Sequence, residues 1–360
     1  MILNDRRRPG LPGELVGRVF AIWLAVTLLQ IAATAMVGWV SPLPAESPGW
    51  GLSTLVSALT LGCVMLLIGR IAFRIFDEEI AGLACLACAA AVPLMVALRP
   101  VAFDLHGLQA VCGLFALNGL MARDARYGGW AIGAALAAWL ALSLDGMVLA
   151  LGFAVIPALK WLRNRAERWW LVHTLHALAV VAAAILAAKW FAGMPPACGT
   201  LGIAHLAAFA WMAGILTVVA LFEPHPRAFT IAGMVAAAGG AGLLLHGIAP
   251  GCAIGPTLGL AAAPPLWHRS AIFAIQALAL PLLGLVATLR LIAPAGDWLR
   301  RWWSDYALLI LLAAMATAFD ARVAAAACVL AAVPIGWQLR EWIRSARNTR
   351  RVGRRVLAFR

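Results

Sequence analysis

Long apolar stretches alternate with short polar connections along nearly the whole chain. A transmembrane helix needs about 17 to 25 mainly apolar residues, and twelve stretches come close enough to this length to be predicted as membrane-crossing helices. Their approximate limits are 18–40, 52–72, 79–98, 106–122, 129–144, 146–162, 170–191, 201–222, 228–247, 271–292, 305–319 and 323–339. The pattern therefore predicts an all-α, polytopic transmembrane helix bundle with about 12 spans.

Two pairs of predicted spans leave an alternative open. The fifth and sixth are joined only by residues 143–146, and the last two only by residues 320–322. Either pair could instead form a re-entrant hairpin that enters and leaves the membrane on one side. With no internal repeat and no soluble domain, we expect a basic N-terminal segment 1–17, a transmembrane domain 18–339 and a basic tail 340–360.

The composition agrees with a membrane protein. Hydrophobic residues make up 64% of the chain and charged residues 12%, with a mean hydropathy of +0.92, outside the range of ordinary soluble domains. A net charge of +13 would suggest nucleic-acid binding in a soluble protein, but here the basic residues fall in short clusters between apolar runs, as cytoplasmic loops do. We therefore expect no nucleic-acid partner. The first apolar run, Val19 to Val40, is too long for a signal-peptide core and is expected to be retained.

The distribution of basic residues predicts the orientation. With the N-terminus inside, 24 of the 28 lysines and arginines lie in cytoplasmic connections or termini, and four lie outside. Cytoplasmic loops carry such an excess, so both termini are predicted to be cytoplasmic. The preference for arginine over lysine is typical of a GC-rich bacterial genome. We expect the protein to lie in a bacterial inner membrane. The tail carries eight arginines among apolar residues, which suits an anionic leaflet, so membrane lipids are expected partners.

The outer connection RPVAFDLHGLQ, from Arg99 to Gln109, is a polar island between two long apolar segments and carries an arginine, an aspartate, a histidine and a glutamine. Ionisable residues at such places are functional candidates by default. Asp104 and His106 could present a carboxylate and an imidazole to a divalent cation or a phosphate-bearing substrate. The alternative is that Asp104 only caps the following helix. Asp145, in the neighbouring outer loop, is a further acidic candidate.

Cysteine and histidine pairs give weaker signals. Cys198 and Cys252 both fall in outer loops, where an oxidising periplasm permits a disulfide between them. The sequence does not give the distance between the two cysteines, so both the bridged and the free forms are kept as alternatives. His173 and His176 share a helix face near a predicted cytoplasmic end. Aromatic and histidine residues are common at the headgroup layer, so we expect an interfacial role and not a haem or metal pair.

Four segments fall in an order that resembles bacterial polytopic C-type (GT-C) glycosyltransferases, relatives of the oligosaccharyltransferase catalytic subunit. The segments are SPGWGLSTLVSAL, RPVAFDLHGLQ, LALSLDGMVLALGF and GCAIGPTLGLAAAPPLWHRS. The second resembles a family loop that carries Arg, Asp, His and Gln, although Leu105 stands where the family has a further histidine. Cys252, Gly255 and Pro256 are similar to a later Cys-x-x-Gly-Pro loop.

Such enzymes transfer a sugar from a polyprenyl-phosphate carrier at the membrane surface, using outward-facing carboxylates that bind a divalent cation or activate the acceptor. The resemblance implies three sets of site residues: catalytic Asp104, His106 and Glu46; Asp104 and Asp145 as ligands of Mg²⁺ or Mn²⁺; and Arg99, Arg269 and His268 as groups that bind substrate phosphate. A polyprenyl-phosphate-linked sugar is then the expected substrate.

Two alternatives differ in class from this enzyme. Glu46 is the only acid in the first outer loop, where the family has an acidic motif, and metal-assisted transfer needs its ligands. A catalytically inactive relative would be a structural or assembly subunit that packs against other membrane subunits. A transporter ranks third, because transporters place charges near the bilayer midplane and often contain repeats, whereas the charges here lie at span ends.

Overall fold

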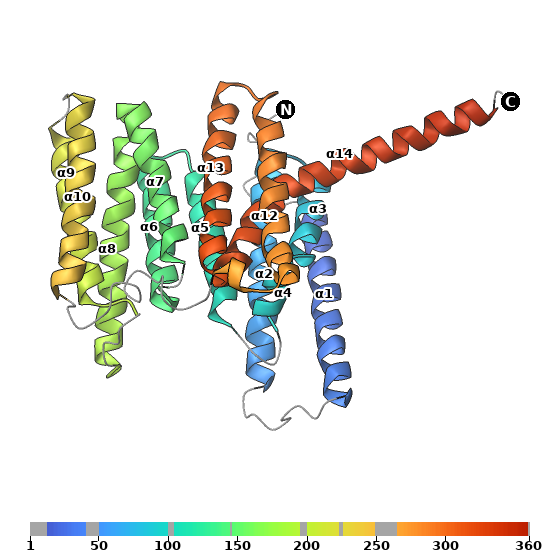
Figure 1. The fold of residues 1–360 in the computed structure, drawn as a ribbon, viewed down its shortest axis with the longest axis horizontal. Helices are drawn as coiled ribbons and strands as arrows, with labels where there is room; N and C mark the ends of the chain where they lie inside the picture. Colours follow the sequence, from blue (N-terminus) through green and yellow to red (C-terminus); the bar gives the residue numbers. More distant parts are fainter. Residues whose placement is uncertain are drawn as a thin grey trace. The chain divides into compact units, whose positions relative to one another are not determined.

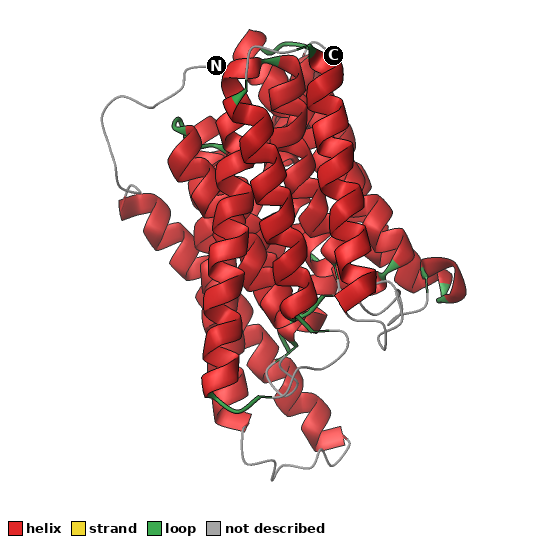
Figure 2. Cartoon of the chain, turned by 90° about the vertical axis from the view of Figure 1, so that its left-hand side faces the viewer, coloured by secondary structure: helices red, strands yellow, loops and turns green. Residues whose placement is uncertain are grey.

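A computed structural model describes residues 13–40, 50–99, 104–144, 146–194, 200–222, 226–248 and 265–358. Within these ranges every regular element is a helix (Figure 2). The elements are α1 (Gly13–Val40), α2 (Trp50–Ile75), α3 (Glu78–Ala89), α4 (Val92–Ala97), α5 (Leu105–Leu120), α6 (Ala125–Leu142), α7 (Met147–Arg163), the 3-10 helix η1 (Arg165–Glu167), α8 (Arg168–Phe191), α9 (Ile203–Leu221), α10 (Arg227–Ile248), η2 (Leu266–His268), α12 (Ala271–Ile292), α13 (Asp297–Phe319), η3 (Ala321–Val323) and α14 (Ala324–Ala358). The predicted all-α class is confirmed for this part of the chain.

Eight helical segments among the described residues are long and apolar enough to cross a membrane. They are Gly13–Ala32, Leu52–Ile75, Arg165–Phe191, Ile203–Leu221, Arg227–Ile248, Ala271–Ile292, Asp297–Phe319 and Ala321–Asn348. Large apolar side chains such as Leu29, Phe191 and Leu221 are exposed on these helices, as expected of surfaces that lipid tails cover. The chain is therefore an integral, multi-pass membrane protein.

The third to sixth predicted spans are helical but short. Predicted span 79–98 is divided into α3, with 12 residues, and α4, with 6. Helices α5, α6 and α7 have 16, 18 and 17 residues. At about 1.5 Å per residue, 16 residues reach roughly 24 Å, less than the hydrocarbon core of about 30 Å. The count of twelve spans and the orientation of the termini stay predictions.

The helices group into two compact units. Unit 1 consists of residues 1–107, 275–311 and 327–360, and unit 2 of residues 108–274 and 312–326. Unit 1 thus holds α1 to α4 with most of α12, α13 and α14, whereas unit 2 holds α6 to α10. Helix α14 continues without interruption past residue 339, where the basic tail was expected to begin, to Ala358.

Glycines bring α6 directly against α8 in unit 2. A Cβ atom added to Gly129 would lie 2.6 Å from the His173 Cβ, and one added to Gly133 would lie 2.7 Å from the Ala177 Cβ. Both distances are too short for carbon atoms, so only hydrogen fits at these positions. Small residues four apart let membrane helices approach closely, and α6 and α8 lie side by side in Figure 1.

A proline inside α14 of unit 1 leaves one backbone carbonyl without its usual N–H donor, and a side chain of a neighbouring helix donates to that carbonyl instead. Pro334 has no N–H to donate to the carbonyl of Leu330, four residues earlier. The phenol of Tyr306, on α13, donates to that carbonyl oxygen at 2.5 Å. Side-chain donors of this kind are how membrane helices tolerate internal proline.

Helix α12 shows the same arrangement. Pro281 lies inside it and cannot donate to the carbonyl of Ala277, which instead accepts from the Cys328 thiol of α14 at 3.8 Å. A thiol is a weak donor, so this contact is looser than the tyrosine one. Helices α12 and α14 also pack closely, because a Cβ on Gly284 would lie 2.5 Å from the Ala331 Cβ.

Candidate functional site at the start of α5

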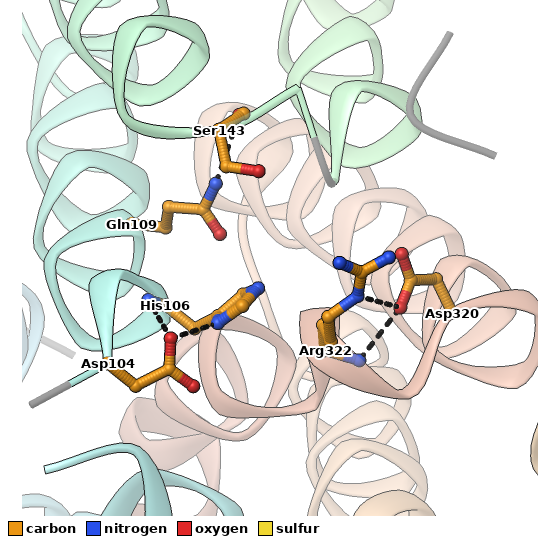
Figure 3. Close-up of polar contacts among 6 residues, drawn as sticks. All are labelled: Asp104, His106, Gln109, Ser143, Asp320 and Arg322. Carbon is orange, nitrogen blue, oxygen red and sulfur yellow. Dashed lines mark hydrogen bonds and ion pairs between the residues drawn. The ribbon is translucent and has the colours of Figure 1, made fainter. Parts of the chain in front are cut away.

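The carboxylate of Asp104 makes two contacts at the start of α5. Its Oδ1 atom accepts from the backbone N–H of His106 at 3.2 Å and also contacts His106 Nδ1 (Figure 3). The first N–H groups of a helix have no partner within the helix, and a short acidic side chain before it commonly accepts from one. Asp104 therefore caps α5, and the same carboxylate holds the imidazole.

The two side chains differ in their exposure. That of Asp104 is 46% exposed, whereas that of His106 is only 14% exposed. With the proton on Nδ1, the ring donates to the carboxylate, and this hydrogen bond fixes both the tautomer and the orientation of the ring. The other ring nitrogen, Nε2, is buried, so a substrate can reach the carboxylate of this pair but not the far side of the ring. The pair has the chemistry of an exposed general base that a histidine orients.

Backbone contacts within unit 1 keep Arg99 near this pair. The backbone N–H of Asp104 donates to the Ala97 carbonyl at 3.3 Å, so the two ends of the connection between α4 and α5 meet. The hydroxyl of Ser57, on α2, donates to the carbonyl of Arg99 at 3.4 Å. Arg99 is exposed. Arg99 therefore supplies an exposed positive charge in the same short connection as Asp104.

Gln109, one helical turn after His106, has a structural role in unit 2. It is buried, and its Nε2 donates to the carbonyl of Ser143 at 3.1 Å (Figure 3). Ser143 ends α6, where carbonyl groups have no partner within the helix. Gln109 therefore holds the end of a neighbouring helix, a role that the sequence did not indicate.

Other aspartates at helix starts share the capping role but not the imidazole contact. Asp124 Oδ1 accepts from the Arg126 N–H at 3.2 Å. Asp320 Oδ1 accepts from the Arg322 N–H at 2.9 Å and lies 3.3 Å from the Arg322 Nε (Figure 3). Capping is thus a general use of aspartate in this chain. The contact with a histidine ring distinguishes Asp104.

The remaining sequence candidates are placed as follows. Glu46, Asp145, Cys198 and Cys252 lie outside the described residues, so their roles stay predictions. His268 ends η2 with its ring 6.3 Å from that of Trp267, and the Arg269 guanidinium lies 5.9 Å from the Phe273 ring. His268 and Arg269 belong to unit 2, whereas Asp104 and His106 belong to unit 1.

Metal ligands do not gather within the described ranges. Among these residues no group of three or more His, Cys, Asp or Glu side chains is placed to hold a metal ion. His173 instead stacks on Trp169, with ring centroids 5.9 Å apart, and His176 Nδ1 lies 2.9 Å from the carbonyl of Val172 on the same helix. The described residues therefore offer proton-transfer chemistry at Asp104 and His106.

Comparisons with known proteins add no family to this picture. No family model, no curated protein and no solved structure matches the chain. Functional inference therefore rests on the residues at the start of α5.

Proposed function

We propose that this multi-pass membrane protein transfers a sugar from a polyprenyl-phosphate carrier to an acceptor hydroxyl, with the Asp104 carboxylate as the general base. The observation that supports the proposal best is the contact between the Asp104 carboxylate and His106 Nδ1. A base that is oriented in this way contributes typically about 10²- to 10⁴-fold to a transfer rate. The resemblance of RPVAFDLHGLQ to the C-type family supplies the substrate class.

The proposed step moves one proton and exchanges one bond. The acceptor hydroxyl gives its proton to the exposed Asp104 carboxylate while its oxygen bonds to the anomeric carbon of the sugar. The bond from that carbon to the phosphate oxygen breaks, and the polyprenyl phosphate leaves with the electron pair. The guanidinium of Arg99 would balance the added negative charge, as a planar cation with several donors can. His106, whose Nδ1 contacts the same carboxylate, holds it in position.

A divalent cation would require ligands beyond those described. Asp104 already accepts from the His106 backbone and contacts its ring, and a magnesium or manganese site would need further carboxylates such as Asp145 or Glu46. No step of the proposed reaction therefore passes through a metal.

The experiment compares Asp104→Asn with Asp124→Asn in membranes supplied with a polyprenyl-phosphate-linked radiolabelled hexose. Asparagine caps a helix about as well as aspartate, so both variants keep a cap and lose one charge. We expect Asp104→Asn to reduce transfer at least about 10²-fold, with Asp124→Asn close to wild type and membrane insertion unchanged in both. Undiminished transfer in Asp104→Asn would refute the role of the pair.

The second candidate function is that of a catalytically inactive subunit of a membrane complex. It is favoured by the shared capping role of Asp104, Asp124 and Asp320, which explains these acids without catalysis. It predicts a stoichiometric partner that co-purifies after mild detergent extraction. A preparation that is consistently monomeric would count against it.

A further inference from the structure

Helix α14 is longer than a membrane span requires. It has 35 residues, which at about 1.5 Å per residue corresponds to roughly 52 Å, whereas the hydrocarbon core measures about 30 Å. Its uncharged part ends at Leu339, and the first charged residue of the helix is Arg340. The C-terminal part of α14 therefore extends beyond the hydrocarbon while remaining one continuous helix.

The extension is basic along its whole length. After Glu341 the sequence contains no acidic residue up to its last position, 360. Arginine positions 344, 347, 351 and 354 recur every three or four residues, which places them along one side of a helix. Apolar positions such as 342, 352 and 356 fall on the opposite side. A helix with this division is suited to lie in the headgroup layer of an anionic membrane.

Acidic residues of α3 hold α14 where this extension begins. Arg340 forms an ion pair with Asp77, and Arg344 Nη2 lies 3.9 Å from Glu79 Oε2. Asp77 is itself the N-cap of α3, since its side chain accepts from the Ile80 N–H at 3.0 Å. These contacts neutralise the first two arginines of the extension.

Close packing also holds α14 against α3, next to these ion pairs. A Cβ on Gly336 would lie 2.7 Å from the Ala84 backbone nitrogen, so α14 touches the backbone of α3. In Figure 1 the C-terminal part of α14 runs obliquely to α2 and α12, which belong to the same unit, and extends beyond them. If α2 and α12 cross the bilayer, this part of α14 is inclined toward the plane of the membrane surface.

We propose that the segment 345–358 of α14 binds the phosphate groups of anionic phospholipids on the surface of the protein's own membrane. This segment contains five arginines and no acidic residue. Because the segment continues directly from a membrane-spanning helix, that surface is the nearest source of negative charge. Each basic residue near an anionic surface adds attraction that salt weakens. This inference does not depend on the proposed transferase activity.

The test measures backbone hydrogen exchange in residues 345–358 of the full-length protein in lipid nanodiscs. Discs of phosphatidylcholine alone are compared with discs in which about one third is phosphatidylglycerol, a fraction that gives a strongly negative surface. We expect exchange at least about tenfold slower in the anionic discs, because several arginines contribute to binding. The difference should disappear at about 0.5 M salt, where charges are screened within a few ångströms.

Two variants separate the tail from a general effect of charge. Arg347→Gln/Arg351→Gln/Arg354→Gln should abolish the lipid dependence. The control Arg163→Gln/Arg165→Gln/Arg168→Gln removes the same number of positive charges from around the connection between α7 and α8. It should leave the lipid dependence of exchange in residues 345–358 unchanged. Hydrogen exchange in α2 and α12 reports whether each variant is folded. If a variant does not fold, the comparison of low and high salt on the wild-type protein still tests the proposal. Equal exchange in the two kinds of disc at low salt would overturn the proposal.

Discussion

The hydrogen bond from Tyr306 to the Leu330 carbonyl exists because Pro334 cannot supply the usual backbone donor. We therefore expect Tyr306→Phe to destabilise the protein through one unsatisfied buried carbonyl and not through lost packing. The phenol is buried and its oxygen lies 2.5 Å from the carbonyl oxygen. An unpaired buried acceptor costs about 1 to 3 kcal/mol, while side-chain hydrogen bonds in membrane proteins average about 0.6 and reach about 1.7 kcal/mol. We expect a loss of about 1 to 2 kcal/mol.

A second substitution tests the cause. Pro334→Ala restores an N–H four residues after Leu330, so the carbonyl regains a backbone donor and no longer depends on the phenol. In that background Tyr306→Phe should cost less than about 0.5 kcal/mol, which gives a coupling energy of about 1 kcal/mol in the double-mutant cycle. The other tyrosine in the chain, Tyr127, is 77% exposed, and Tyr127→Phe provides the matched control.

The assay is the free energy of unfolding in mixed micelles, followed by far-ultraviolet circular dichroism as a denaturing detergent is added. Four proteins complete the cycle, and the Tyr127→Phe protein should match the wild type within about 0.5 kcal/mol. The reasoning is refuted if Tyr306→Phe costs as much in the Pro334→Ala background as in the wild type, since the loss would then come from packing.

Further predictions concern helix contacts in each unit. Gly133→Ala should destabilise by about 1 to 3 kcal/mol because its Cβ overlaps the α8 backbone, whereas Gly239→Ala, with open space around its Cβ, should be neutral; equal thermal stability of the two would contradict this packing. Asp77→Ala removes both the cap of α3 and the ion pair with Arg340, and should cost about 1 to 2 kcal/mol. Asp77→Asn keeps a capping oxygen and should cost less than about 1 kcal/mol, so equal losses in a denaturation assay would argue against the cap.

Apolar runs predict where the helices lie because membrane helices must be apolar over most of their surface. The predicted segment 271–292 coincides with α12. The break in the third predicted span follows from Pro93, near the start of α4, because proline has no N–H to donate to the carbonyl four residues earlier, that of Ala89, where α3 ends. Hydropathy ends the last span at residue 339, yet α14 continues, because an arginine-rich sequence favours helix without being apolar.

Contacts between distant segments could not be predicted from the sequence. The carboxylate of Asp104 and the ring of His106 are two residues apart, so their contact is local and the sequence indicates it. Arg340 and Asp77 are 263 positions apart, and only the packing of α14 against α3 brings them together. The donation from Gln109 to Ser143 likewise depends on how α5 and α6 pack, which neither residue type reveals.

The most direct test of the proposed function asks where a lipid-linked phosphate binds. A polyprenyl phosphate that carries a photoreactive diazirine near its phosphate is crosslinked to the full-length protein in membranes, and the labelled peptides are identified by mass spectrometry. We predict labelling around Arg99 and residues 104–109, which excess unlabelled polyprenyl phosphate suppresses and Arg99→Gln weakens. Labelling spread over the lipid-facing surfaces of α9 and α10, with no competition by the unlabelled lipid, would contradict the account.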